Sequence, residues 1–261
     1  MLELYHNDMS TCAQKVRLAL AEKEANWHSH HLDLRARDQQ KPEYIKLNPN
    51  AVVPTLNHDG AIIIESTVIN EYIDDALAGP ALRPAAARGR ARMRLWTKQL
   101  DEGLHADTGV LSTSIAFRYQ KIGKGDDEVK ALIENVPDPV KRERVRANVM
   151  EGVNSPYFKD AVLRFDRLLG RMEQTLANDP WLAGDTFSLA DIAFTPYATR
   201  LDHLQLSQLW RHRPQFAAWY DRIKQRNSYQ VGMVQWFNPK YLALMEEKGR
   251  QEWPRVKAII G

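Results

Sequence analysis

The sequence has a single cysteine, Cys12, in 261 residues. One cysteine cannot form an intramolecular disulfide, so the fold does not depend on an oxidising compartment. The sequence also lacks a run of 18 or more apolar residues, and it begins directly with the strand-like LELY. These features argue against a membrane-spanning helix and a secretory signal peptide. We therefore expect a cytoplasmic protein that is not inserted in a membrane.

An excess of charge of one sign is also missing. The chain carries 36 Lys and Arg against 33 Asp and Glu, and the two kinds are interleaved over most of its length. Nucleic-acid-binding proteins gather basic residues on one face, so we expect no nucleic-acid partner. His28 and His30 form an H-x-H pair beside His31, but no third ligand follows at a recognisable spacing. We therefore expect no metal site.

The first part of the chain alternates strand and helix patterns. Asp59-Gly60 between two apolar runs is a strong hairpin signal, and Gly79-Pro80 ends the last helix. The order βαβαββα, with a mixed four-stranded sheet, is thus predicted for an α/β domain over residues 1–81. The expected elements are strands at 2–5, 27–32, 54–56 and 61–64, and helices at 10–23, 42–47 and 66–75.

Strand patterns almost vanish after residue 84, and helical ones replace them. The length and the 44% hydrophobic content suit two compact domains, so residues 85–261 are predicted to form an all-α helical bundle, with 82–84 as linker. The highly charged segment 123–146 is expected to be a solvated helical insertion. The predicted helices of this domain span 88–119, 159–177, 188–201, 214–226 and 233–247.

Ser188 and Asp191 have the spacing of a helix capping box. The Ser188 hydroxyl can accept from a free backbone N–H, while Asp191 reaches back toward Ser188. We interpret the pair as a folding feature.

Ser10-Thr11-Cys12 directly precedes a predicted helix. Either hydroxyl can cap that helix. Alternatively, Ser10 donates a hydrogen bond to the sulfur of a bound thiol and, with the helix N-terminus, favours the thiolate of a group whose pKa is ordinarily about 8.5. Cys12 could instead form a mixed disulfide with the thiol, whereas Tyr5 is interpreted as core or pocket lining.

Two further pairs, Val53-Pro54 and Glu65-Ser66, lie where strands begin or end. In a thioredoxin-like fold, a cis bond before Pro54 would leave the Val53 backbone free to pair with a peptide-like ligand; an ordinary trans proline at a sheet edge is the alternative. Ser66 at a helix N-terminus suits a carboxylate and Glu65 an ammonium, which together match a γ-glutamyl group. The alternative for Ser66 is a simple N-cap, although Ile69 at the capping-box position cannot reciprocate it.

The joint order of these motifs is the informative feature. STCAQKVRLAL, NPNAVVPTL, the Asp-Gly hairpin, ESTVINEYI and a helical part with SLAD resemble the cytosolic glutathione transferase superfamily over essentially the whole chain. The resemblance implies a thioredoxin-like N-terminal domain, glutathione as co-substrate and a homodimer. It also implies roles for individual residues. At one position the chain departs from the family, because Val52 stands where Lys, Arg or Gln often precedes Val-Pro. The STC segment looks like the serine-type site with Ser10 as the catalytic residue, and the glutathione contacts map onto Gln40, Val53, Pro54, Glu65 and Ser66.

Longer segments are similar to bacterial transferases related to the lignin β-aryl-etherases. They are MRLWTKQLDEGLH, ENVPDPVKRERVR and DRLLGRMEQTLANDPWLAGDTFSLADI. The similarity implies thiolate attack on a hydrophobic, aromatic electrophile. A glutathione-dependent β-etherase or lyase, a reductase or isomerase, and a non-catalytic glutathione-binding or scaffold protein remain as alternatives. The expected second-substrate pocket comprises Met9, His105, Leu111 and Phe117.

Overall fold

The computed structural model describes residues 1–123, 125–136 and 138–261. Within these ranges the chain forms two compact units, each assembled from three segments. The domain boundaries expected from the sequence, 1–81 and 85–261, stay a prediction. The first unit comprises Met1–Thr97, Asp179–Tyr197 and Ala218–Asn238, and the second comprises Lys98–Asn178, Ala198–Ala217 and Pro239–Gly261.

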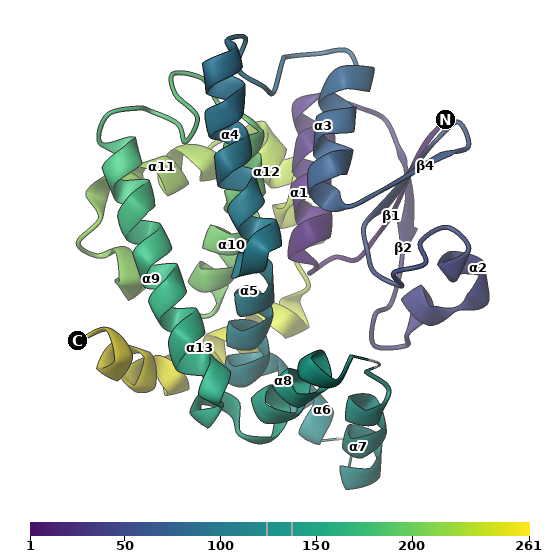
Figure 1. Ribbon diagram of the computed structural model, residues 1–261, viewed down its shortest axis with the longest axis vertical. Helices are drawn as coiled ribbons and strands as arrows, with labels where there is room; N and C mark the ends of the chain where they lie inside the picture. Colours follow the sequence, from purple (N-terminus) through teal and green to yellow (C-terminus); the bar gives the residue numbers. More distant parts are fainter. Residues whose placement is uncertain (124, 137) are drawn as a thin grey trace. The chain divides into compact units, whose positions relative to one another are not determined.

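The first unit contains a mixed four-stranded sheet in the order β2-β1-β3-β4 (Figure 1). Strands β1 and β2 are parallel, and the other two pairs are antiparallel. The thioredoxin-like order βαβαββα is therefore confirmed. Its elements are β1 (Leu2–His6), α1 (Thr11–Glu22), β2 (His28–His31), the 3-10 turn η1 (Asp38–Gln40), α2 (Pro42–Ile45), β3 (Thr55–His58), β4 (Ala61–Ile64) and α3 (Ser66–Ala76).

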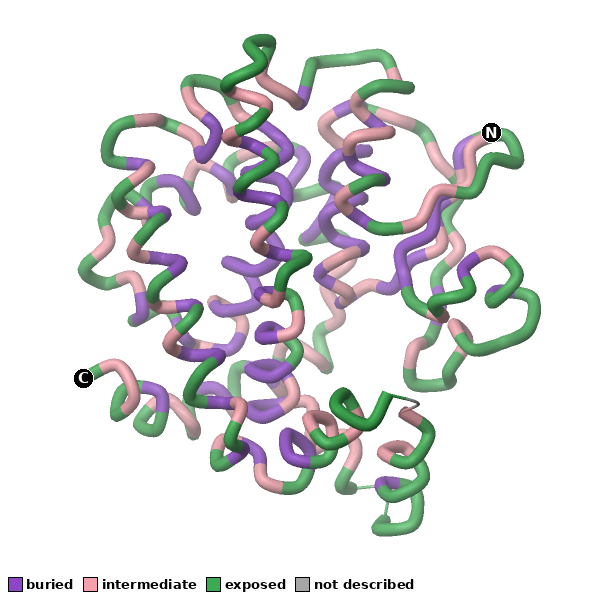
Figure 2. Tube along the Cα trace, viewed as in Figure 1, coloured by how far each residue is buried: buried purple, intermediate pink, exposed green. Residues whose placement is uncertain are grey.

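Apolar side chains of α1 and α3 form the core beside this sheet. The two helices lie side by side on one side of the sheet, with α2 on the other (Figure 1). Figure 2 shows α1 buried along nearly its whole length. Val16 on α1, Ile69 and Ile73 on α3, and Leu4 and Leu56 on the strands are fully buried. Burial of this apolar surface positions the N-termini of both helices.

The long helix predicted at 88–119 is present as a nearly continuous series of helical segments. Two short π-helical stretches interrupt it, and Gly103 in the first has φ 147°, which a residue with a side chain rarely adopts. The segments are α4 (Ala87–Gln99), η2 (Leu100–Leu104), α5 (His105–Ser112), η3 (Thr113–Phe117) and α6 (Tyr119–Ile122).

The charged segment 123–146 is helical and largely exposed where the structure describes it; its residues Lys124 and Pro137 lie outside the described residues. It contains α7 (Asp126–Glu134) and the start of α8 (Pro139–Met150). The remaining elements are η4 (Gly152–Asn154), α9 (Pro156–Leu176), α10 (Leu189–His203), η5 (Ser207–Trp210), α11 (Pro214–Lys224), α12 (Asn227–Gly232), η6 (Val234–Trp236) and α13 (Pro239–Ile260).

The helix predicted at 233–247 is present only from Pro239 onward, and it continues to Ile260. The chain leaves α12 at Gly232, makes the short turn η6, and starts a new helix, α13, at Pro239. Proline lacks an N–H and has a fixed φ, so it suits the first position of a helix rather than its interior. Met233 therefore lies in the turn that follows α12, whereas Tyr241 lies on α13.

Asp191 is a hydrogen-bonding centre of the first unit, as the capping-box spacing predicted. Its fully buried carboxylate accepts from the N–H of Leu182 and of Ser188, both at 3.0 Å, and from Trp219 Nε1 at 2.9 Å. The Ser188 hydroxyl donates to the same carboxylate and accepts from the Ala190 N–H. Burial raises the pKa of Asp191 to about 6, and these hydrogen bonds partly counteract that effect.

Candidate functional site

Ser10 caps helix α1. The loop after β1 leads to Ser10, whose Oγ accepts a hydrogen bond of 3.3 Å from the Ala13 N–H, while the helix starts at Thr11. Ser10, not Thr11, therefore supplies the cap. A hydroxyl can accept one hydrogen bond while donating another, so capping leaves the Ser10 proton for a bound sulfur. The two roles expected for Ser10 are compatible.

Arg17 holds the loop that leads to Ser10. Its guanidinium is buried and donates to the carbonyl oxygens of Asn7, Asp8 and Gly232 at 2.8 to 2.9 Å. It also lies over the Trp236 ring, 5.1 Å from the ring centroid. Because a buried guanidinium needs partners for its donors, these carbonyls fix the loop and the segment around Gly232 against α1. The sequence argument missed Arg17, although a charged residue on an otherwise apolar helix face was the available signal.

His6, at the end of β1, is neutral in this environment. Arg17 approaches its Nδ1 at 3.1 Å, and since a guanidinium only donates, Nδ1 is the acceptor. The Ser29 hydroxyl lies 2.8 Å from Nε2. Burial, and then the positive charge of Arg17, lower the pKa of His6 to about 3. Burial and Arg200 similarly lower the pKa of His203, in the second unit, to about 4.

These shifts predict acid destabilisation. Below the ordinary histidine pKa of 6.5, the unfolded chain protonates His6 and His203 while the folded chain does not, so stability is lost as pH falls. Asp191 acts in the opposite direction, because below about pH 6 the folded state binds its proton first. These three groups together leave one extra proton on the unfolded chain, so they should lower the free energy of unfolding by about 1.4 kcal/mol per pH unit between about pH 6 and 4. Urea denaturation at several pH values measures this; constant stability would contradict it.

Val53-Pro54 is a cis peptide bond, as the ligand-pairing hypothesis required, so the trans alternative is wrong. The Val52 carbonyl accepts from the Tyr44 hydroxyl at 2.6 Å and from Asn48 Nδ2 at 2.9 Å. Val53 itself makes no backbone hydrogen bond to another residue of the ranges that the structure describes. The chain is thus anchored just before Val53, and the N–H and C=O of Val53 remain available.

Glu65 precedes α3 with φ 67°, and Ser66 is the first residue of that helix. The N-cap is therefore Glu65, and the alternative of Ser66 as a simple N-cap is wrong. The Ser66 residue is 7% exposed, and Asn50 Nδ2 lies 3.3 Å from Glu65 Oε1. The Glu65 carboxylate, the N-terminus of α3 and the Ser66 hydroxyl thus come from two consecutive residues. Asn50 was not predicted, because it is distant in sequence from Glu65.

The sheet register brings these motifs to one end of the first unit. Thr55 pairs with Tyr5 on β1 and with Ile64 on β4. The ends of β1 and β4 and the start of β3 therefore lie at the same edge of the sheet. The loop to Ser10 follows β1, Val53-Pro54 precedes β3, and Glu65 follows β4. Strand β2 runs parallel to β1, so the segment leading to Gln40 leaves this edge as well. The contacts expected for one ligand thus come from four connections at a single sheet edge.

The other predicted residues have simpler surroundings. Gln40 is exposed in η1, and Met9 is buried in the first unit. In the second unit, His105 is exposed, Leu111 is buried, and Phe117 packs edge-on against Tyr241 at 5.5 Å. Their role as a second-substrate pocket stays a prediction.

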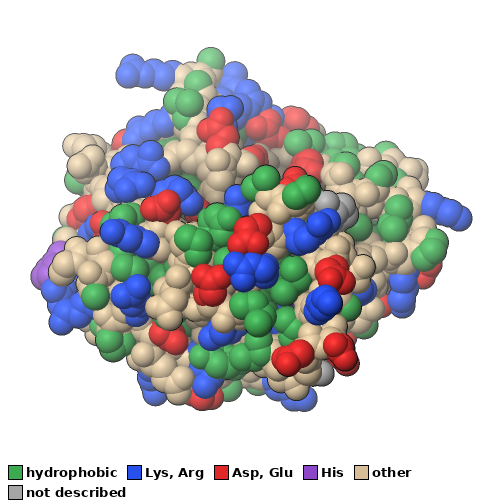
Figure 3. All heavy atoms as spheres, turned by 60° about the horizontal axis from the view of Figure 1, so that its bottom comes forward, with side chains coloured by type: hydrophobic (Ala, Val, Ile, Leu, Met, Phe, Trp, Pro, Cys, Tyr) green, Lys and Arg blue, Asp and Glu red, His purple; other side chains and the backbone are tan. Residues whose placement is uncertain are grey.

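The histidines of β2 are engaged with protein groups. His30 Nε2 lies 2.7 Å from Glu3 Oε2, and its ring stacks on Tyr5 at 4.2 Å between centroids. Among the residues that the structure describes, no three His, Cys, Asp or Glu side chains form a group that could hold a metal ion. No helix in the described ranges is both long and apolar enough to cross a membrane. On the face drawn in Figure 3, basic and acidic side chains are interspersed.

Comparisons with known proteins agree on one family. The sequence model for the glutathione S-transferase N-terminal domain matches residues 9–76, and that for the C-terminal domain matches residues 140–222. The chain is 29% identical to Protein LigF of Sphingobium sp. (strain NBRC 103272 / SYK-6), over 86% of this chain and 90% of the relative. It is 26% identical to tetrachloro-p-hydroquinone reductive dehalogenase of Sphingobium chlorophenolicum, over 89% and 96%.

Solved structures give a matching result. The crystal structure of beta-etherase LigF from Sphingobium sp. strain SYK-6 has a TM-score of 0.79 at 28% identity and covers 90% of this chain and 99% of its own. That of glutathione transferase F7 from Populus trichocarpa, at 24% identity, covers 91% and 100%, with a TM-score of 0.69, and supports the fold.

Proposed function

Because the chain belongs to the glutathione S-transferase family, we propose that it binds glutathione at the sheet edge described above and activates it as a thiolate against a hydrophobic, aromatic electrophile. The proposal rests on the strand register, in which Thr55 of β3 pairs with Tyr5 of β1 and with Ile64 of β4. It gathers the Ser10 hydroxyl, the unpaired Val53 backbone and the start of α3 into one place. A tripeptide with a thiol, two carboxylates and an ammonium has a complementary set of groups.

In the proposed complex each motif contacts one part of glutathione. The Val53 N–H and C=O pair with the peptide backbone beside Pro54, as in the addition of a short strand. The γ-glutamyl carboxylate lies at Ser66 and the start of α3, and its ammonium lies at Glu65. Gln40 contacts the glycine carboxylate. The sulfur is then held at the N-terminus of α1 within reach of Ser10.

Ser10 acts on the thiol. Its hydroxyl accepts from the Ala13 N–H and donates its own proton to the sulfur, so it stabilises the thiolate more than the thiol. The thiol proton leaves to solvent, and the thiolate attacks an electrophilic carbon. In a substitution, a carbon–sulfur bond forms and the leaving group departs with the electron pair of its bond to that carbon. In an addition, a carbon–sulfur bond forms at an activated double bond, which accepts the electron pair of the sulfur.

Glutathione-dependent ether cleavage is a second candidate. The relative LigF has a solved structure described as a beta-etherase, and it matches nearly the whole of this chain. In such a reaction the thiolate attacks the carbon that carries an aryl ether oxygen, and a phenolate leaves. Because another relative is a reductive dehalogenase, reduction of the electrophile is a third possible reaction. We also propose that the enzyme is cytoplasmic, homodimeric and active in detoxification. Sedimentation measures whether it is a dimer.

Calorimetric titration with glutathione tests the binding site. Glu65→Gln and Ser66→Ala should each weaken binding by about tenfold, since each removes a hydrogen bond to a charged group. Glu24→Gln changes an exposed carboxylate near the opposite end of α1 and serves as the control, with unchanged affinity expected. Turnover of a panel that includes a β-aryl ether and an aryl halide then distinguishes the reactions. Absence of glutathione binding to the wild-type chain would exclude all of them.

A further inference from the structure

Segment 226–238 of the first unit, which we call the strap, runs along helix α1. Its helix α12 lies beside α1 (Figure 1). The strap is hydrogen-bonded at three points, which follow one another from the C-terminal end of α1 to the loop before Ser10. The bonds join Arg226 twice to the Glu22 carboxylate at 2.7 Å, the Gly232 carbonyl to Arg17 at 2.9 Å, and Asn238 Nδ2 to Asp8 Oδ2 at 3.0 Å.

At Gly232 the backbones of the strap and α1 are in direct contact. A Cβ placed on Gly232 would lie 3.0 Å from the carbonyl carbon and oxygen of Arg17 and from the Leu18 Cα, which is closer than most Cβ contacts in proteins. These are backbone atoms, which cannot turn aside as the end of a flexible side chain can. The φ of Gly232 is outside the left-handed region, so glycine serves the close approach rather than the backbone conformation. The missing side chain thus lets the Gly232 carbonyl reach Arg17.

The Trp236 ring packs on buried groups at the start of α1. It lies edge-on to His6, with 4.7 Å between ring centroids, and 5.1 Å from the Arg17 guanidinium. It also stacks on Trp27 at 5.8 Å, and its Nε1 donates to the Val231 carbonyl at 3.1 Å. An aromatic face stabilises a guanidinium that is removed from water. The ring therefore fixes the side chain through which the strap acts on the loop.

Asp8, in the loop that leads to Ser10, is held by the strap, by α1 and by strand β2. Asn238 of the strap donates to its carboxylate, and Arg17 of α1 donates to its carbonyl at 2.8 Å. Its own N–H donates to His31 Nε2 of β2 at 3.2 Å. Because Ser10 follows two residues later, a shift of Asp8 should move the Ser10 hydroxyl. A hydrogen bond depends on distance and angle, so a small shift weakens one that this hydroxyl donates.

We propose that the strap positions the Ser10 hydroxyl against the sulfur of bound glutathione. Gly232, Trp236 and Asn238 are its positioning residues. This role rests on the proposed function, because it concerns the same sulfur. None of the three residues is assigned a contact with glutathione, so their substitution should change the thiol and leave the other contacts intact. With the strap displaced, Ser10 donates a weaker hydrogen bond, and the pKa of the bound thiol rises.

Titration of thiolate ultraviolet absorbance in the glutathione complex tests this role. Gly232→Ala places a methyl group against the backbone of α1, and Asn238→Ala removes the bond to Asp8. Each should raise the pKa of the bound thiol by about one unit, which is a roughly tenfold loss of thiolate below that pKa. The ionisable groups that contact the loop are Asp8, Arg17, His6 and His31. Both variants retain all of them, so a shift reports the position of the hydroxyl rather than a change of charge.

Two further measurements separate positioning from loss of the binding site. S-methylglutathione has no thiol proton, so its calorimetric Kd reports the remaining contacts and should equal that of wild type in both variants. Trp236→Leu removes the aromatic face from Arg17 and should raise the thiol pKa, whereas Trp236→Phe keeps an aromatic face and should restore a value near that of wild type. Weaker S-methylglutathione binding together with an unchanged thiol pKa would overturn the role.

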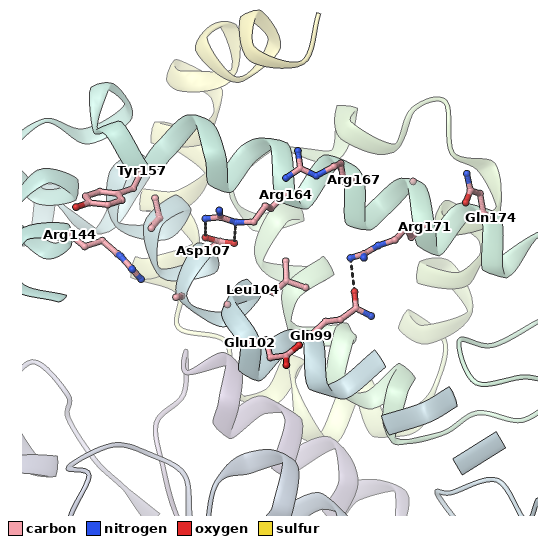
Figure 4. Close-up of a pocket in the computed structure, with 14 residues that line it drawn as sticks. Gln99, Glu102, Leu104, Asp107, Arg144, Tyr157, Arg164, Arg167, Arg171 and Gln174 are labelled. Carbon is pink, nitrogen blue, oxygen red and sulfur yellow. Dashed lines mark hydrogen bonds and ion pairs between the residues drawn. The ribbon is translucent and has the colours of Figure 1, made fainter. Parts of the chain in front are cut away.

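Two variants of the second unit serve as controls. Gly170→Ala makes the same change where a Cβ would have no heavy atom within 4 Å beyond its chain neighbours and its own helix turn. Arg164→Leu removes the partner of the buried Asp107 carboxylate, which accepts two hydrogen bonds from Arg164 (Figure 4), so it lowers stability without touching the strap. Both should leave the thiol pKa unchanged. An equal rise with Arg164→Leu would show that any loss of stability has this effect, and would overturn the role.

The result for wild type distinguishes the two proposals. Wild type that binds neither glutathione nor S-methylglutathione would overturn the proposed function and, with it, the role of the strap. Wild type that binds glutathione, with an unchanged thiol pKa in Gly232→Ala, Asn238→Ala and Trp236→Leu, would overturn the role of the strap alone.

Discussion

Replacing Ser10 with alanine is expected to lower kcat/KM for glutathione conjugation by about 100-fold or more, the effect typical of removing one hydrogen-bond donor from a developing or stabilised anion. The pKa of the bound thiol should rise toward its ordinary value, which titration of thiolate ultraviolet absorbance measures. Ser10→Thr, which keeps a hydroxyl at the cap, should retain most of the activity. A Ser10→Ala enzyme with full activity would refute the assigned role.

Stability and catalysis must be separated in this experiment, because Ser10 also caps α1. Loss of the bond to the Ala13 N–H should itself cost about 1 kcal/mol of unfolding free energy. Ser10→Asn keeps a capping acceptor but not the hydroxyl, so its stability should stay near that of wild type while its kcat/KM falls as that of Ser10→Ala does. Cys12→Ser should keep wild-type turnover. If Cys12→Ser abolishes turnover instead, the cysteine-based reductase or isomerase becomes the better hypothesis.

Replacing Asp191 with alanine is expected to reduce the free energy of unfolding by about 3–5 kcal/mol, which is among the largest effects of a single substitution. The change leaves the N–H groups of Leu182 and Ser188 and the indole of Trp219 buried without their acceptor. Each unsatisfied donor costs about 1–3 kcal/mol, and partial relaxation reduces the sum. Denaturant titration at pH 7 measures the loss.

Asp191→Asn provides the matched control. The amide has the same shape and keeps an acceptor oxygen, but its NH₂ group faces donors, so the loss of stability should be intermediate. Because asparagine does not titrate, this variant should also lack the Asp191 contribution between about pH 4 and 6, and its stability should fall more steeply with acid than that of wild type. A loss below 1 kcal/mol for Asp191→Ala would contradict the assigned role.

Local patterns predicted those parts of the molecule whose causes are local. Two apolar runs joined through Asp59-Gly60 led to the hairpin, and Ser10 was a correct candidate cap because a hydroxyl just before a helix satisfies an adjacent N–H. The spacing of Ser188 and Asp191 was sufficient for the same reason. The cis bond at Val53-Pro54 was one of two alternatives, because composition and periodicity alone do not distinguish it from a trans bond.

Features that depend on distant segments were missed. In the sequence, Arg17 is an ordinary basic residue close to Lys15, and its partner carbonyl at Gly232 is separated from it by 215 positions. The break before Pro239 was overlooked because apolar residues on both sides imitate helical spacing.

The carbonyl bonds of Arg17 have a consequence for synthesis on the ribosome. Translation of the first 97 residues supplies every residue proposed to contact glutathione, yet neither the Gly232 carbonyl nor the Trp236 ring exists at that stage. The nascent chain therefore displays α1 without the segment that packs on it, and the loop before Ser10 lacks part of its support until residue 238 has left the exit tunnel. The support of the loop before Ser10 is thus completed late, when most of the polypeptide has been made.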